Sequence, residues 1–242
     1  MSLEWRKRVQ IFLIVVMAVA AVRLFLIYQS RHEEVPAQPV ATIKNKVGVD
    51  DYVYLKKTNA YDLESSRGIV GKTVWVRTGN QLMYYPLDAS TNSPDFKHAA
   101  GVLPPLEKLL IKDVGLLDDG GKYAQMMAIF QMQGSTKKFV VSVGAMRDSK
   151  YIIFIDDIFF FEDPHVLYKH WPAEFWIAVD HHEVKPGMNE LQAALSLGGS
   201  ALVGNGVYGN RTLQYPNVGK PVTVTFSENQ ATQITAGMAA EK

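Results

Sequence analysis

The side chains best suited to chemistry in this 242-residue chain gather in one stretch, between residues 156 and 182. Carboxylate oxygens and imidazole nitrogens are the groups with which proteins hold divalent metal ions. Their spacing here does not form a helical His-Glu-x-x-His pair or another ligand pattern of known geometry. The metal candidates are Asp156, Asp157, Glu162, Asp163, His165, His170, His181 and His182.

The same stretch also has a purely structural interpretation. Asp156 and Asp157 can end a strand and cap a loop, and Asp163 precedes a proline as an ordinary turn opener. His181 and His182 can close a helix near its negative end. We therefore predict no metal site and no cofactor, and we keep a metal-dependent enzyme that uses this cluster as the alternative.

Other catalytic patterns are incomplete. Ser142 lacks the Gly-x-Ser-x-Gly context of a hydrolase nucleophile. The run Gly68–Thr73 ends in Gly-Lys-Thr, but its first two glycines are too close together for a phosphate loop, and a strand follows it. The absence of cysteine excludes disulfides, thiolate zinc sites and cysteine-held iron–sulfur clusters. A net charge of +1 gives no electrostatic basis for binding nucleic acid. We predict no catalytic residues.

The N-terminal residues resemble a membrane anchor. A basic tip at residues 1–8 precedes a mainly apolar run over residues 9–28, close to the about 20 residues that span a bilayer as a helix. The positive charges before this run predict that the N-terminus is in the cytoplasm and that the following domains are in the periplasm or outside. The prediction is a single-pass protein of the inner membrane that contacts the lipid bilayer through residues 9–28. A cleaved signal peptide, with Ala18–Ala20 at the cleavage site, is the alternative.

After a proline-containing tether at residues 29–48, residues 49–162 read as successive strands. Short turn-rich links separate these runs, a pattern typical of a small antiparallel barrel or sandwich, and a Src-homology-like barrel is the first expectation. The predicted strands are Tyr52–Lys56, Thr73–Arg77, Gln81–Tyr85, Leu109–Val114, Tyr123–Gln131, Phe139–Ala145 and Tyr151–Phe160.

A complete helix signal stands at residues 185–199 (KPGMNELQAALSLGG). Asn189 can accept from the backbone of the first turn while Gln192 reaches back, which forms a capping box. Glycines at 198 and 199 can end the helix. The signal predicts a helix over residues 190–197.

A helix over Pro172–Asp180 is expected before this one, although a strand over Phe175–Val179 is the alternative. Three β-favouring runs follow the helix predicted over residues 190–197. They are Arg211–Tyr215, Val222–Phe226 and Ala231–Thr235. The predicted fold class is therefore α+β: an N-terminal transmembrane helix, a small antiparallel β-barrel and then an α-α-β-β-β module.

The order of Pro-Gly-Met, a capped helix, a glycine-rich loop with Tyr208-Gly209, Leu213-Gln214-Tyr215 and Val224-Thr225-Phe226 resembles the SmpA/OmlA (BamE-type) domain of outer-membrane assembly lipoproteins. The resemblance covers about residues 172–236 and implies two helices followed by a three-stranded sheet over the C-terminal region, 163–242. The chain departs from the family in having no lipobox cysteine, a longer glycine-rich loop at 198–209 and a large region in front.

These observations favour a membrane-anchored envelope protein that acts by binding other membrane or envelope proteins, as a non-catalytic assembly factor or accessory subunit. A cell-wall-binding module is a further alternative. A glycine-rich loop exposed after a helix is a common place for a binding site. The predicted partner-binding residues are Arg23, Trp171, Trp176, Gly204, Gly206, Tyr208 and Arg211.

Overall fold

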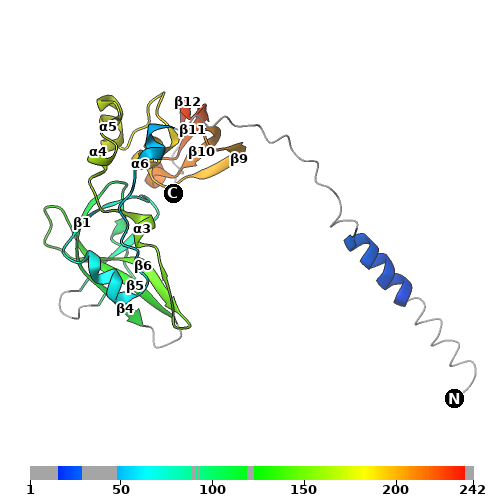
Figure 1. The fold of residues 1–242 in the computed structure, drawn as a ribbon, viewed down its shortest axis with the longest axis horizontal. Helices are drawn as coiled ribbons and strands as arrows, with labels where there is room; N and C mark the ends of the chain where they lie inside the picture. Colours follow the sequence, from blue (N-terminus) through cyan, green and yellow to red (C-terminus); the bar gives the residue numbers. More distant parts are fainter. Residues whose placement is uncertain (1–15, 29–47, 89–90, 92, 119–122, 238–242) are drawn as a thin grey trace, which may run out of the picture. The chain divides into compact units, whose positions relative to one another are not determined.

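The computed structural model describes residues 16–28, 48–88, 91, 93–118 and 123–237 (Figure 1). The chain divides into two compact units, residues 1–48 and residues 49–242. In the first unit, a helix covers residues 16–28, and its side chains, Arg23 among them, are exposed.

The predicted transmembrane helix over residues 9–28 is contradicted. A helix that crosses a membrane needs about 20 mainly apolar residues. No helix within the described ranges is both long enough and apolar enough to do so. Residues 9–15 of that prediction, the tip at 1–8 and most of the tether at 29–48 lie outside the described residues.

The second unit contains an eight-stranded antiparallel sheet in the order β3-β2-β6-β5-β4-β1-β8, with β7 paired to β6. Its centre is formed by the long strands β4, β5 and β6, each joined to the next by a hairpin (Figure 1). The strands are β1 (Thr73–Val76), β2 (Met83–Pro86), β3 (Gly101–Val102), β4 (Lys108–Asp118), β5 (Tyr123–Met132), β6 (Phe139–Arg147), β7 (Lys150–Ile153) and β8 (Phe159–Phe160).

This sheet is a half-barrel and does not close. Its end strands, β3 and β8, contain only two residues each and pair with β2 and β1 alone. The predicted strand over Tyr151–Phe160 is wrong because the short helix α3 (Ile155–Ile158) separates β7 from β8. The break falls at Asp156 and Asp157, the two charged residues in an otherwise apolar run.

The segment from residue 49 to residue 62 lies along the second unit as a strap. It starts with the 3₁₀ turn η1 (Val49–Tyr52) and leads to the helical turns α2 (Leu63–Ser66) and η2 (Arg67–Ile69). The predicted strand over Tyr52–Lys56 is wrong. Val53 and Leu55 do alternate inward as a strand would, but no described strand pairs with the segment.

Two further helices follow the large sheet, α4 (Pro164–Leu167) and α5 (Ala173–Asp180). Helix α5 confirms the helix predicted over Pro172–Asp180, so the alternative strand over Phe175–Val179 is wrong. Pro172 stands directly before the first helical residue, where its missing N–H costs nothing.

Helix α6 (Glu190–Leu197) has the predicted bounds, and the capping box between Asn189 and Gln192 is present. The sheet that follows has four antiparallel strands instead of the predicted three, in the order β12-β11-β10-β9. The additional strand occupies the region predicted to be a glycine loop. The strands are β9 (Ala201–Val207), β10 (Asn210–Tyr215), β11 (Val222–Ser227) and β12 (Gln230–Ala236), with the turn η3 (Asn217–Gly219) between β10 and β11.

The predicted fold class is therefore wrong. The second unit is mostly β, an open half-barrel plus a four-stranded sheet, with few and short helices. It is neither a closed barrel nor an α-α-β-β-β module. The three-stranded sheet was wrong because β9 contains glycines and has no periodic apolar pattern. The closed barrel was wrong because closure depends on the length of the end strands, and the sequence does not show that these strands are short.

Helix α6 is buried between two cores. Leu195 packs in an aromatic core with Trp171 and Trp176, whereas Ala193 and Leu197 pack in the core of the small sheet. A third core lies within the half-barrel and contains buried side chains of β4, β5 and β6. Because α6 belongs to two cores, the small sheet is fixed to the rest of the second unit.

The strap is also fixed by a polar contact. The carboxylate of Asp156 on α3 accepts hydrogen bonds from the backbone N–H and hydroxyl of Thr58, at 2.8 and 2.7 Å, and from the N–H of Asn59 at 3.0 Å. The neighbouring carboxylate, Asp157, is exposed.

We predict that Asp156→Ala lowers the free energy of unfolding by about 2 kcal/mol, because it leaves partly buried donors of the strap without their charged acceptor. Asp157→Ala, on the same short helix, should change it by less than about 0.5 kcal/mol. Urea denaturation of the two variants measures the difference. Equal effects of the two substitutions would contradict the role assigned to Asp156.

Candidate functional site

The eight predicted metal candidates are not brought together. Within the described ranges, no group of three or more histidine, aspartate or glutamate side chains is arranged to hold a metal ion. Asp156 binds the strap, and His182 contacts the backbone carbonyl of Ser196 through Nδ1 at 3.0 Å. Asp157, Glu162 and His181 are exposed.

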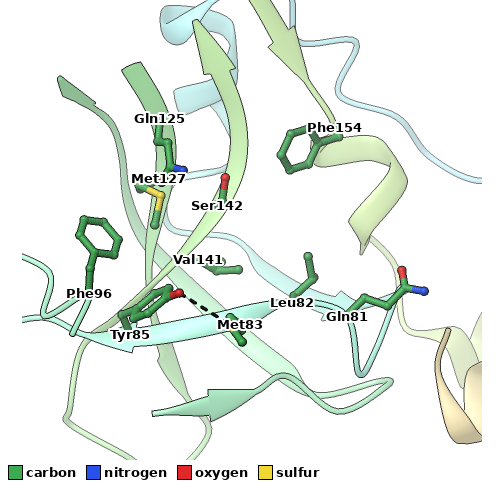
Figure 2. Close-up of a pocket in the computed structure, with 10 residues that line it drawn as sticks. All are labelled: Gln81, Leu82, Met83, Tyr85, Phe96, Gln125, Met127, Val141, Ser142 and Phe154. Carbon is green, nitrogen blue, oxygen red and sulfur yellow. Dashed lines mark hydrogen bonds between the residues drawn. The ribbon is translucent and has the colours of Figure 1, made fainter. Parts of the chain in front are cut away.

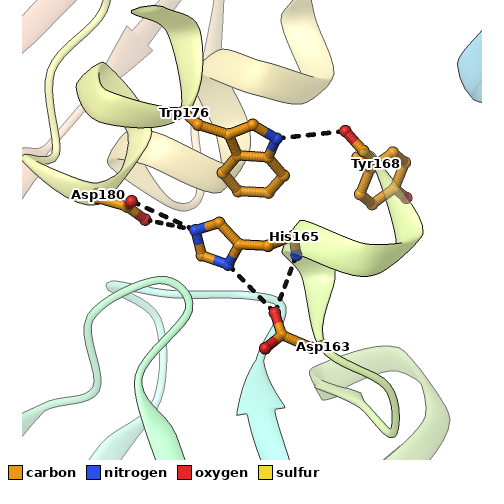
Figure 3. Close-up of polar contacts among 5 residues, drawn as sticks. All are labelled: Asp163, His165, Tyr168, Trp176 and Asp180. Atoms are coloured by element: carbon orange, nitrogen blue, oxygen red, sulfur yellow. Dashed lines mark hydrogen bonds and ion pairs between the residues drawn. The ribbon is translucent and has the colours of Figure 1, made fainter. Parts of the chain in front are cut away.

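His165 lies between two carboxylates and links α4 to α5. Its Nδ1 is 3.1 Å from Asp163 and its Nε2 is 3.0 Å from Asp180, while its ring stacks on Trp176 at 4.0 Å between ring centroids (Figure 3). Both ring nitrogens can donate at once only when the imidazole is protonated. The three polar side chains are each nearly half exposed, so the contact joins two surface helices.

Asp50, which the sequence did not single out, accepts three hydrogen bonds. Its donors are His170 Nε2 at 2.6 Å, Trp171 Nε1 at 2.7 Å and Asn189 Nδ2 at 2.7 Å. The carboxylate therefore joins the beginning of the strap to the aromatic core and to the N-terminal end of α6. No local signal marks Asp50, because every one of these partners is at least 120 residues away in the sequence.

Two predicted partner-binding residues, Trp171 and Trp176, are buried. They are 6% and 9% exposed and pack against each other with ring centroids 4.9 Å apart. The Trp176 Nε1 donates to the backbone carbonyl of Tyr168 at 3.2 Å. Both tryptophans therefore stabilise the second unit from within and offer little surface to a partner.

Four of the other predicted partner residues, Gly204, Gly206, Tyr208 and Arg211, lie in the hairpin of β9 and β10, whereas Arg23 lies in the helix of the first unit. Between the pairs Val203–Thr212 and Val207–Asn210, β9 contains two more residues than β10, which is a bulge. Gly204 has φ +71°, and a Cβ on Gly206 would lie 2.6 Å from the Arg211 side chain. Glycine is therefore required at both positions by the backbone geometry of the bulge.

Arg211 is paired inside the protein. Its guanidinium donates to Glu190, from Nε at 2.9 Å and from Nη2 at 2.6 Å, and these bonds raise the pKa of Arg211. Glu190 is 3% exposed and also accepts from the N–H of Gly209 at 2.5 Å. The guanidinium of Arg211 lies 5.6 Å from the ring centroid of Tyr208, within the range of a cation–π contact. These contacts fix the hairpin to the first turn of α6.

The outer edge of β9 is not paired with any strand of the described part of the chain. All seven residues of this strand are exposed, and its apolar side chains include Leu202 at 48%, Val203 at 44% and Val207 at 46%. At the opposite edge of the same sheet, the exposed side chains of β12 include the polar residues Thr232 and Gln233. The two edges of one sheet therefore differ in chemistry. The sequence pointed to this region as a glycine-rich loop but could not reveal that it is a strand at the edge of a sheet.

Comparison with protein-family models, with curated proteins and with solved structures gave no match. The resemblance to the SmpA/OmlA domain therefore stays a prediction.

We predict that Arg211→Met lowers the free energy of unfolding by about 3 kcal/mol, because it leaves the buried Glu190 carboxylate without its cation. Combining it with Glu190→Gln should restore part of the loss, since a neutral amide costs less to bury. Denaturant titration measures both variants.

Arg147→Met is the matched control. Arg147 pairs with Asp148 at 3.9 Å and is 74% exposed, so its loss should cost less than about 0.5 kcal/mol. If the two arginine variants were equally stable, the Glu190–Arg211 pair would not be the contact that holds the hairpin.

Proposed function

We propose that this protein works by binding another polypeptide, which adds a strand to the outer edge of β9, and that it is a non-catalytic assembly factor or accessory subunit. The observation that carries the proposal is the exposure of all seven β9 residues at the end of a sheet. An edge strand presents a row of backbone donors and acceptors that can pair with an extended segment of another chain.

The chemistry of the edge supports this proposal. Natural edge strands are commonly blunted by charged side chains or proline. The β9 sequence, ALVGNGV, contains neither, and no strand in the described part of the chain pairs with its outer side. Its bulge is the one blunting feature that is present, and it leaves residues 201–203 in regular register with β10.

The edge is held in place before any partner binds. Glu190 ties the β9–β10 hairpin to α6 through Gly209 and Arg211. A preorganised edge loses little conformational entropy on binding, so more of the backbone pairing contributes to affinity. The partner segment that fits is extended and uncharged, with apolar side chains on both faces, because Leu202 and Val203 are consecutive residues that point to opposite faces of the sheet.

A photocrosslinking amino acid tests this surface in the cells that make the protein. With p-benzoyl-phenylalanine in place of Leu202, we expect a discrete adduct with a different polypeptide, identified by mass spectrometry. The same amino acid in place of Gln233, on the polar edge of the same sheet, should give no such adduct.

A second pair of variants checks that the crosslink at position 202 depends on strand pairing at the β9 edge. Val203→Lys places a charge on the β9 edge and should reduce the adduct at position 202 by about tenfold or more. Thr232→Lys makes the same change on β12 and should leave it unchanged. The proposal fails if positions 202 and 233 crosslink equally, or if neither gives an adduct.

A further inference from the structure

A second surface feature, separate from the β9 edge, is a cavity of about 480 Å³ on the half-barrel (Figure 2). Its floor is formed by strands β2, β6 and β5, which are neighbours in the sheet. Cavities of this size accommodate small molecules. The side chains that line the cavity determine which kind of small molecule can bind there.

Strand register explains which side chains face the cavity. Val141 on β6 is paired with Tyr84 on β2 and with Ala128 on β5, and these three residues belong to the core of the half-barrel. The adjacent position on β6 is Ser142, which is paired with Met127 on β5. Because side chains alternate along a strand, Ser142 and Met127 project from the opposite face of the sheet, and they line the cavity together with core residues such as Val141.

Aromatic side chains bound the cavity on opposite sides. Phe96 stands on one side and Phe154 on the other (Figure 2). The Phe96 ring packs edge to face on Tyr85 of β2, with ring centroids 5.1 Å apart. With a boundary at both sides, the space suits a compact molecule better than a continuous polypeptide.

The polar groups are few and neutral. Among the residues that the structure describes, no side chain lining the cavity carries a charge. Gln125 makes no side-chain hydrogen bond to any described residue, and the Ser142 hydroxyl has only a 3.5 Å contact with the carbonyl of Gly144. Met83 is 57% exposed and offers apolar surface, whereas Met127 lines the cavity but is only 3% exposed.

We propose that this cavity binds a small neutral molecule with an aromatic or other flat apolar body and one carbonyl or amide group. The body lies against Met127, Met83 and Phe96, where polarisable sulfur and ring edges give favourable contacts. The side-chain amide of Gln125 then donates to the carbonyl of the ligand. A charged ligand would lose its hydration without gaining an opposite charge, so the site selects against it.

Methionine methyl signals in NMR spectra of the full-length chain test the site directly, with benzamide as the probe. We expect the signals of Met83 and Met127 to shift and saturate with added benzamide. Benzoate has nearly the same shape but is charged, and it should bind at least about tenfold more weakly. Saturable shifts confined to methionines outside the cavity, or equal binding of benzoate, would overturn the proposal.

Two matched variants test the role of the amide. Gln125→Leu should weaken benzamide binding about fivefold, as expected for the loss of one neutral hydrogen bond. Gln233→Leu, on the other sheet, should not change it. If another segment of this chain or a bound peptide fills the cavity, the two methyl signals will not respond to benzamide, and the proposal is then wrong.

Discussion

The buried carboxylate of Glu190 is the interaction on which the arrangement of the small sheet depends. A charge in a position that is 3% exposed is stable only if it is compensated, and here the compensation comes from Arg211 and the N–H of Gly209. Glu190 also stands in the first turn of α6, where the helix dipole favours a negative charge. One residue earlier, Asn189 caps the same helix and donates to Asp50 of the strap. The first turn of α6 therefore fixes both the strap and the β9–β10 hairpin.

This anchoring has a consequence for β9. Its inner side is held by β10, and β10 is held by α6, so the outer side is a fixed edge with which no strand of the described residues pairs. A sheet with two free edges needs some protection against unwanted pairing. On β12 the exposed side chains Thr232 and Gln233 are polar, whereas on β9 Leu202 and Val203 are apolar. That difference is the physical basis for assigning partner binding to β9.

The sequence predicted local features well and long-range ones poorly. The bounds of α6 followed from Asn189, Gln192 and the glycines after the helix, because a cap is made by neighbouring residues. The sequence predicts a loop where strand β9 lies, since the glycines of β9 mask any period and its pairing with β10 is a tertiary property. Asp50 was missed for the same reason, as its donors come from distant parts of the chain. The glycine-rich composition drew attention to residues 198–209, but only the sheet shows that part of this segment is an edge strand.

The most direct measurement of the central claim is backbone hydrogen exchange of the full-length protein, alone and with a bound partner polypeptide. Strand pairing would place the outward N–H groups of β9 in new hydrogen bonds, which slows their exchange. If a partner strand pairs with β9, we expect added protection within residues 201–207 and none within residues 230–236. Protection that appears elsewhere on the second unit, while the exchange of residues 201–207 stays unchanged, would contradict it.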